Sequence, residues 1–173
     1  MRIILETLSE SDAKALYKFE MENRAFFEKW VPIRGEEYYK WEVYKTIHQS
    51  LLEEQFQGKS YFYLIKGEDE VILGRVNLID VEASSKTGHL GYRIGEAYSG
   101  KGLVSKALGL LLEKVRELGV NHIEAKTTTS NIASRRILEK NGFTQTATKE
   151  RNFEMNGESI AFVYYSWNST NNR

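Results

Sequence analysis

The fold is decided by residues 90–105, which read LGYRIGEAYSGKGLVS. Up to Ile94, apolar residues alternate with other types, which is the period of a half-buried β-strand. From Val104 onwards an apolar stripe follows helical spacing instead, and it continues through Leu108, Leu111, Val115 and Leu118. Gly100 and Gly102 lie between the two patterns. The sequence therefore predicts a strand that passes through a glycine-rich turn into an amphipathic helix.

This turn suits an anionic ligand. Glycines let backbone amides converge because they have no Cβ, and a helix start carries partial positive charge that favours a phosphate or pyrophosphate. The turn is not a P-loop, because no Gly-Lys-Ser/Thr closes it. It is not a Rossmann fingerprint either, because a third glycine is missing and the preceding strands are expected to be antiparallel. An ordinary glycine turn before a helix is the simpler alternative.

The segments on either side complete a pattern of strands and helices. Helices are expected from Ala13 onwards and over residues 36–57, 104–118 and 132–140. Strands are expected at residues 3–5, 61–65, 71–79, 87–94, 122–128, 143–153 and 159–167, with Asn156-Gly157 as a hairpin turn. Short connections between the central strands predict an antiparallel meander. We therefore expect an α+β (mixed α/β) fold, with a single mixed, mostly antiparallel twisted sheet flanked by helices.

Length and composition exclude several classes of protein. The 173 residues correspond to about one domain, expected to span residues 1–167, with residues 168–173 as a frayed tail. Lys and Arg number 24, as do Asp and Glu, which argues against a nucleic-acid partner. No apolar run reaches the ~18 residues of a membrane span, and the first residues do not resemble a secretory signal, so we expect a cytoplasmic protein. Cysteine is absent and the three histidines lack ligand spacing, so no metal site is predicted.

A second segment of interest, residues 129–136, reads TSNIASRR. Asn131 lies at a predicted helix start, where an asparagine is by default an N-cap. Ser134 would then be the third helical residue, with a hydroxyl that satisfies the nearby backbone. Arg135 is by default a solvated surface charge. Taken alone, the segment needs no ligand to explain it.

Taken together and in this order, the two segments are far more specific. With Gly100-Lys101-Gly102, Asn131-x-x-Ser134 and Gly142-Phe143, the chain resembles the GNAT superfamily of acetyl-CoA-dependent N-acetyltransferases. The run at residues 90–95 and the Asn-x-x-Ser spacing resemble the branch that contains the ribosomal-protein alanine N-acetyltransferases. The resemblance covers most of the chain and is strong over residues 72–167.

The resemblance implies acetyl-CoA as the cosubstrate. Its pyrophosphate would be held by the backbone amides of Gly100, Lys101, Gly102, Leu103, Val104 and Ser105. The backbone of Tyr92, Arg93 and Ile94 would pair with the pantetheine arm as an added strand does. An amide there would also steady the oxyanion formed at the thioester carbonyl. Asn131 would hydrogen-bond the pantetheine, and Arg135 would meet a coenzyme phosphate.

The chain departs from the superfamily pattern at two positions. Ala97 stands where the loop often begins with Gln or Arg, and Leu138 stands where many members place a tyrosine as general acid. In the branch resembled here, the serine of Asn-x-x-Ser is the proposed acid, so the resemblance assigns this role to Ser134. A base or a water chain must take the proton of the amine, and a carboxylate desolvated near the sheet opening could serve. Glu124 is the best-placed candidate, and an ordinary surface carboxylate is the alternative.

The acceptor is expected against the first half of the chain. Aromatic side chains crowd there beside Glu28, Glu36 and Glu37, a combination that suits a cationic amine or a basic peptide. The candidate acceptor contacts are Phe27, Trp30 and Tyr38, the alternative being that such rings belong to the core. The resemblance implies direct acetyl transfer to a primary amine, above all the N-terminal α-amine of a protein such as a ribosomal protein. A small amine, polyamine or antibiotic as acceptor, a non-catalytic acyl-CoA-binding sensor, and a homodimer stay open.

Overall fold

The computed structural model describes residues 1–148, 153–155 and 157–169 and is built around a seven-stranded sheet of order β1-β2-β3-β4-β5-β9-β6. Its strands are β1 (Ile4–Thr7), β2 (Tyr61–Lys66), β3 (Ile72–Glu82), β4 (Thr87–Ile94), β5 (His122–Thr128), β6 (Thr144–Thr148) and β9 (Phe162–Asn168). Neighbouring strands are antiparallel except β4 and β5, which run parallel. The expected mixed, mostly antiparallel sheet is confirmed.

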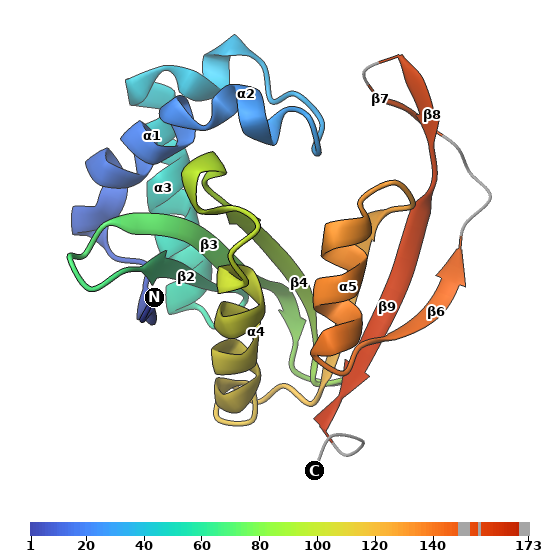
Figure 1. The fold of residues 1–173 in the computed structure, drawn as a ribbon. Helices are drawn as coiled ribbons and strands as arrows, with labels where there is room; N and C mark the ends of the chain where they lie inside the picture. Colours follow the sequence, from blue (N-terminus) through green and yellow to red (C-terminus); the bar gives the residue numbers. More distant parts are fainter. Residues whose placement is uncertain (149–152, 156, 170–173) are drawn as a thin grey trace.

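Helices pack against both faces of this sheet (Figure 1). They are α1 (Ala13–Glu22), α2 (Arg24–Phe27), α3 (Trp41–Phe56), α4 (Leu103–Lys114) and α5 (Ile132–Lys140). One face packs against α4 and α5 in a core that includes Val76, Leu108 and Leu138. The other face packs against α1 and α3, where Leu16 and Tyr44 are buried. We call these the α4/α5 face and the α1/α3 face.

Two elements in the second half of the chain have the predicted bounds, whereas the helix expected over residues 104–118 ends as α4 at Lys114. The strand expected at residues 122–128 and the helix expected at residues 132–140 have those bounds in the structure. Gly119 and Gly142 adopt positive φ angles of 76° and 85°, the left-handed backbone that favours glycine after a helix. Local signals were sufficient here because periodicity and end signals agree at both elements.

The helix expected over residues 36–57 is shorter than predicted. Glu36–Tyr39 forms a separate 3-10 turn, and α3 begins only at Trp41, because Lys40 is extended with φ −80° and ψ 130°. The apolar period that suggested the helix begins at Val43 and so covers only its later part. The four-residue helix α2 was not predicted, since one turn is too short to show a period.

The last strands also differ from the prediction. The strand expected over residues 143–153 ends as β6 at Thr148, and residues 149–152 lie outside the described residues. A separate hairpin pairs β7 (Phe153–Met155) with β8 (Glu158–Ile160), as expected for a turn at Asn156-Gly157, although Asn156 itself is not described. The hairpin lies beyond β9, as Figure 1 shows.

The frayed tail expected over residues 168–173 is not observed at its first two residues. Asn168 pairs with His122 in the sheet, and the Ser169 amide donates to the Asn121 carbonyl at 2.9 Å. Ser169 is buried, and its carbonyl accepts a hydrogen bond from Arg116. The polar composition misled the prediction, because strand pairing and a neighbouring arginine satisfy this backbone. Residues 170–173 lie outside the described residues.

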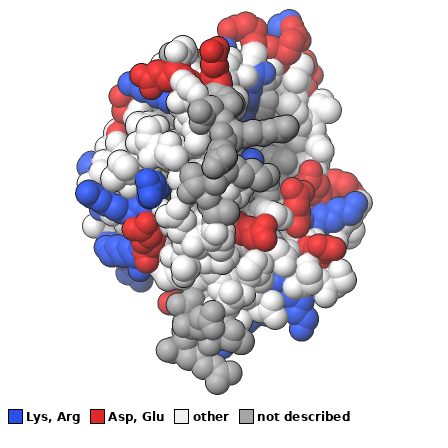
Figure 2. All heavy atoms as spheres, turned by 90° about the vertical axis from the view of Figure 1, so that its right-hand side faces the viewer, with Lys and Arg blue, Asp and Glu red and all other residues white. Residues whose placement is uncertain are grey.

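Surface charge is mixed on the side of the molecule that carries β6 and β9. Figure 2 shows basic and acidic side chains interspersed there, with no continuous basic surface in its described part. Within residues 1–148, 153–155 and 157–169, no helix has the length and apolar character needed to cross a membrane.

Candidate active site

The parallel strands β4 and β5 separate part of the way along the sheet. They pair over only three positions, the last of which joins His89 to Glu124. Beyond it, residues 90–94 keep their pairing with β3 but have no β5 partner in the described chain. Every second backbone N–H and C=O on that edge of β4 is thus available to an extended ligand, which would bind as an added strand. We call this opening the β4–β5 split.

The glycine turn before α4 has the conformation expected of an anion site. Gly100 and Gly102 adopt φ angles of 72° and 74°, and nothing lies within 4 Å of where a Cβ would stand on either residue. The first α-helical bond of α4 runs from the Lys106 amide to the Gly102 carbonyl. The amides of residues 103–105 therefore have no partner within the helix, and the N-cap glycine offers no side chain to them. These amides and the helix dipole suit a pyrophosphate.

Two hydroxyl groups meet between β4 and α5. Asn131 is the N-cap of α5, as its default interpretation held, and its Oδ1 accepts a hydrogen bond from the Ser134 amide at 3.2 Å. The Ser134 hydroxyl bonds the Tyr92 phenol, rather than serving only the local backbone. Ser134 is 8% exposed. The pair lies on the α4/α5 face, next to the unpaired edge of β4.

The Tyr92 phenol is held in its protonated form. Burial raises the pKa of Tyr92 from 10.0 to about 12, although the hydrogen bond to Ser134 acts in the opposite direction. Below about pH 10 the phenol therefore keeps its proton and can donate it to the Ser134 oxygen. The sequence analysis used only the backbone of Tyr92 and missed its hydroxyl. The alternation of Leu90, Tyr92 and Ile94 on one face of β4 was the signal that could have found it.

Glu124 lies on the opposite face of the sheet from Ser134. Its carboxylate is 3.7 Å from His89 Nδ1 and 3.5 Å from His122 Nε2, at the closed end of the split. The side chain is 53% exposed, so the expectation that the Glu124 carboxylate is desolvated was wrong. Side chains alternate across β5, and Ile123 and Ala125 occupy the buried face, which leaves Glu124 toward solvent.

Arg135 is held by the protein itself. Its Nε donates to the Tyr165 hydroxyl at 3.3 Å, and its NH1 group donates to the Thr129 carbonyl at 3.4 Å. The hydrogen bond with Tyr165 raises the pKa of Arg135. Lys101, in the glycine turn, is exposed and lies 5.9 Å from the centre of the Tyr98 ring. Both cations are thus near the start of a helix that borders the split.

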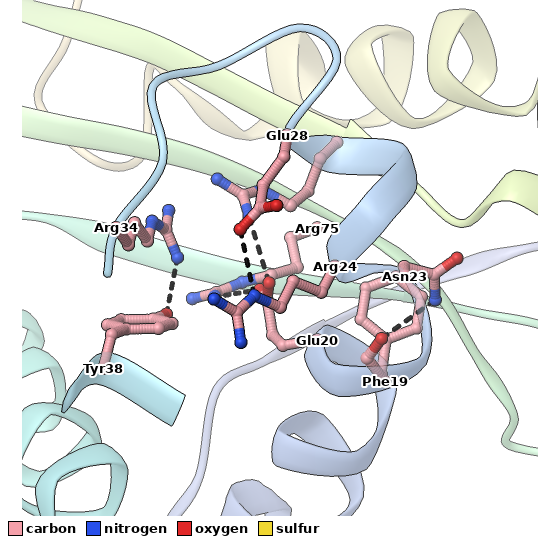
Figure 3. Close-up of polar contacts among 9 residues, drawn as sticks. Phe19, Glu20, Asn23, Arg24, Glu28, Arg34, Tyr38 and Arg75 are labelled. Atoms are coloured by element: carbon pink, nitrogen blue, oxygen red, sulfur yellow. Dashed lines mark hydrogen bonds and ion pairs between the residues drawn. The ribbon is translucent and has the colours of Figure 1, made fainter. Parts of the chain in front are cut away.

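The three expected acceptor contacts have different environments. Phe27 is 5% exposed, with the Arg93 guanidinium 4.8 Å above its ring, so it belongs to the core. Trp30 is 43% exposed on the segment after α2. The Tyr38 hydroxyl accepts a hydrogen bond from Arg34 at 2.5 Å, and Figure 3 shows this pair. Only Trp30 and Tyr38 therefore have surface that an acceptor could touch directly.

The acidic residues near these rings are already paired. Glu36 and Glu28 both bind Arg24, at 2.6 and 2.9 Å, and the bond to Arg24 lowers the pKa of Glu36. Glu37 binds Lys40 at 2.5 Å. The expected attraction of a cationic acceptor by free carboxylates therefore does not hold for these three groups.

A buried ion cluster lies under the same region. Glu20 of α1 is fully buried, and its two carboxylate oxygens each accept a bond of 3.0 Å, one from Arg75 of β3 and one from Arg93 of β4. Figure 3 shows the bond between Arg75 and Glu20. The cluster ties α1 to the α1/α3 face of both strands, immediately beside the split.

The open edge of β4, the glycine turn with its unpaired helix amides and the Tyr92–Ser134 hydroxyl pair all border the β4–β5 split. Residues 2–144 match the family model described as "Acetyltransferase (GNAT) domain", and the chain belongs to this family. The expected family is confirmed.

Individual relatives agree with this assignment. The chain is 31% identical to "Probable N-acetyltransferase YjcK" of Bacillus subtilis, over 90% of this chain and 87% of that protein. It is 26% identical to "[Ribosomal protein uS5]-alanine N-acetyltransferase" of Escherichia coli, over 82% and 77% of the two chains. The solved structure of ribosomal-protein-S5-alanine acetyltransferase from Vibrio fischeri matches the fold with a TM-score of 0.89 at 21% identity, over 98% and 94% of the chains.

The protein is an acetyl-CoA-dependent N-acetyltransferase. Similar solved structures contain coenzyme A or acetyl-CoA. The residues present fit this cosubstrate, because the split offers unpaired backbone groups for an extended arm and the glycine turn offers unpaired amides for a diphosphate. The non-catalytic sensor considered from the sequence is set aside by this assignment.

Proposed function

We propose that this enzyme transfers the acetyl group of acetyl-CoA to the N-terminal α-amine of a protein. The observation that carries the proposal is the Tyr92–Ser134 hydroxyl pair beside the unpaired edge of β4, where a thiol leaving group can be protonated. The choice of acceptor is supported by relatives named as acetyltransferases of ribosomal-protein alanine and serine.

The chain's own groups have three tasks in this reaction. The amides of residues 103–105 hold the diphosphate, and the edge of β4 fixes the extended arm. Acetyl-CoA supplies a thioester, whose carbonyl carbon is open to attack by a neutral amine. As the N–C bond forms and the C–S bond breaks, Ser134 donates its proton to the sulfur and recovers one from the Tyr92 phenol, which solvent reprotonates. The proton of the amine leaves to water.

An N-terminal acceptor explains why an exposed base is sufficient. A free α-amine has a pKa of about 7.7–8.0, against about 10.4 for a lysine side chain, so a useful fraction is neutral near pH 7. Removal of the amine proton therefore needs little catalysis, and positioning supplies most of the rate effect. This agrees with the exposure of Glu124.

The first prediction concerns Glu124. We expect Glu124→Ala to lower kcat at saturating substrates by no more than about tenfold, because an exposed carboxylate beside two imidazoles contributes little as a base. Initial rates of coenzyme A release at pH 7.5 measure this effect. A loss of about a hundredfold or more would show that Glu124 is the essential base.

A second prediction concerns the glycine turn. Gly102→Val places a β-branched side chain at φ 74°, which is strained by roughly 1–2 kcal/mol or more, and relief of that strain moves the amides of the turn. We expect the KM for acetyl-CoA to rise about tenfold, which corresponds to about 1.4 kcal/mol of lost binding.

The matched control for this variant is Gly119→Val. Gly119 has φ 76° and open space around it, but it follows the far end of α4. It should lose similar stability in a urea titration and keep the wild-type KM for acetyl-CoA. An equal KM for the two variants would contradict a binding role for the turn.

The proposed acceptor is tested with a panel of amines. Coenzyme A release should be fast with peptides that begin with alanine or serine and slow with spermidine, lysine amide or an aminoglycoside. Mass spectrometry should place a single acetyl group on the α-amine, and a peptide already blocked at its N-terminus should be inert. Preferential turnover of a small amine would overturn the proposed acceptor while it leaves the enzyme class intact.

A further inference from the structure

On the α1/α3 face of the sheet, two buried side-chain atoms of β3 have no hydrogen-bond partner in the described chain: Nε of Arg75 and Oδ1 of Asn77. Side chains of β3 and β4 stand opposite each other there in three register pairs, which are Arg75 with Arg93, Asn77 with Gly91, and Ile79 with His89. The two arginines share Glu20 as a partner. Asn77 differs, because its Oδ1 is buried and has no hydrogen-bond donor in the described chain. A buried acceptor without a donor is destabilising and calls for a functional explanation.

The residue opposite Asn77 leaves room for a ligand. A Cβ built on Gly91 would meet nothing within 4 Å, so the sheet surface beside Asn77 is open. Gly91 is also among the first residues of β4 beyond the last pair with β5, near the closed end of the split. A small group that reaches the split from the α1/α3 face therefore passes over Gly91 and beside Asn77.

The leaving group and the attacking group need opposite sides of this split. Ser134 and Tyr92 occupy the α4/α5 face, where they serve the sulfur. The amine therefore has its unobstructed approach from the α1/α3 face, which is where Gly91 is open. A neutral amine that directs its lone pair at the carbonyl carbon still has N–H bonds, and these need an acceptor in a fixed position.

We propose that Asn77 is this acceptor, and that its Oδ1 orients the attacking α-amine by accepting an N–H hydrogen bond. This inference rests on the proposed function. The χ2 angle of asparagine is broad and roughly two-fold, so the amide can turn its oxygen toward an arriving amine while the strand stays in place. An amide is not a base at neutral pH, so Asn77 positions the amine and takes no proton from it.

The test compares Asn77→Ala with Asn77→Asp, using acetyl-CoA and a peptide that begins with alanine. Asn77→Ala loses the acceptor oxygen, so we expect its peptide KM to rise about tenfold, while its KM for acetyl-CoA stays at the wild-type value. Asn77→Asp keeps the oxygen and adds a negative charge. Its peptide KM should fall, because the carboxylate attracts the bound ammonium. The rise of kcat with pH should occur at a higher pH than in the wild type, because the carboxylate raises the pKa of that ammonium.

A merely structural asparagine would give a different pattern. Both variants would then show a lower melting temperature, with the peptide KM and the pH profile of kcat unchanged, and this result would overturn the assignment. Failure of the proposed function is distinguishable, because the wild-type enzyme itself would then acetylate no peptide. If wild type acetylates peptides and Asn77→Ala keeps the wild-type peptide KM, only the role of Asn77 is wrong.

Discussion

Ser134→Ala is expected to lower kcat by about 10²-fold, with little change in the KM for acetyl-CoA. The variant removes the hydroxyl that bonds the Tyr92 phenol and would protonate the sulfur, while the Ser134 amide keeps its bond to Asn131. The helix cap is therefore retained, and the loss falls on the chemical step. Steady-state rates of coenzyme A release with an N-terminal alanine peptide provide the measurement.

Two further variants test whether the effect belongs to the hydroxyl pair. Tyr92→Phe keeps the ring but removes the second hydroxyl, and we expect a smaller loss in kcat, because solvent can reprotonate Ser134 more slowly. Ser60→Ala is the matched control, since Ser60 is also buried and accepts a bond from the Asp80 amide on β3. It should lose stability and keep its kcat. If Ser134→Ala retains kcat within about threefold, Ser134 is only a structural residue of α5.

Glu20→Gln is expected to destabilise the folded protein by about 3–5 kcal/mol. The carboxylate is fully buried and is shared by Arg75 and Arg93, so its loss leaves two guanidinium groups on the α1/α3 face without a counter-charge. A domain of this kind has about 5–15 kcal/mol of stability in total, so the variant loses a large share of it. Urea denaturation followed by tryptophan fluorescence measures the loss.

A surface glutamate of the same helix provides the control. Glu22 is 61% exposed and lies 3.7 Å from Lys18, so Glu22→Gln should change stability by less than about 0.5 kcal/mol. A Glu20→Gln protein within about 1 kcal/mol of wild type would mean that water or neighbouring groups compensate the arginines. The buried cluster would then have no major part in fixing α1 to the sheet.

The sequence could predict those parts of the fold whose signals are local. The strand at residues 87–94 and the helix at residues 132–140 each have a period and an end signal that agree, whereas the helix after Gly102 begins as predicted and ends at Lys114, before Gly119. The start of α3 could not be predicted, since the extended Lys40 depends on how neighbouring aromatic rings pack. The end of β9 was missed for a similar reason, because its polar residues are satisfied by distant partners.

The sequence indicated which segments of the chain border the candidate site, but it did not predict which side-chain atoms contact one another there. The glycine turn and Asn131 were picked out because, taken in this order, the two segments resemble the family's pattern. The Tyr92 hydroxyl and the Asn77 oxygen could not, because each gains its meaning from a partner or a missing partner far away in sequence. The ion pairs of Glu28 and Glu36 with Arg24 escaped prediction too, and they partly neutralise the negative charge expected on the acceptor side.

The three-position contact between β4 and β5 has a consequence for how binding and folding are linked. This short ladder, together with the hydrogen bonds from the Asn121 and His122 amides to the Lys86 carbonyl, joins the sheet half of β1 to β4 to the half of β5, β9 and β6. An arm bound in the split would lengthen that ladder, so the donor would act as a temporary eighth strand that fastens the halves. Binding of the donor and contact between β4 and β5 should therefore stabilise each other by the same coupling free energy. Substitutions that weaken this contact, even far from any reacting atom, should also weaken the affinity for the donor.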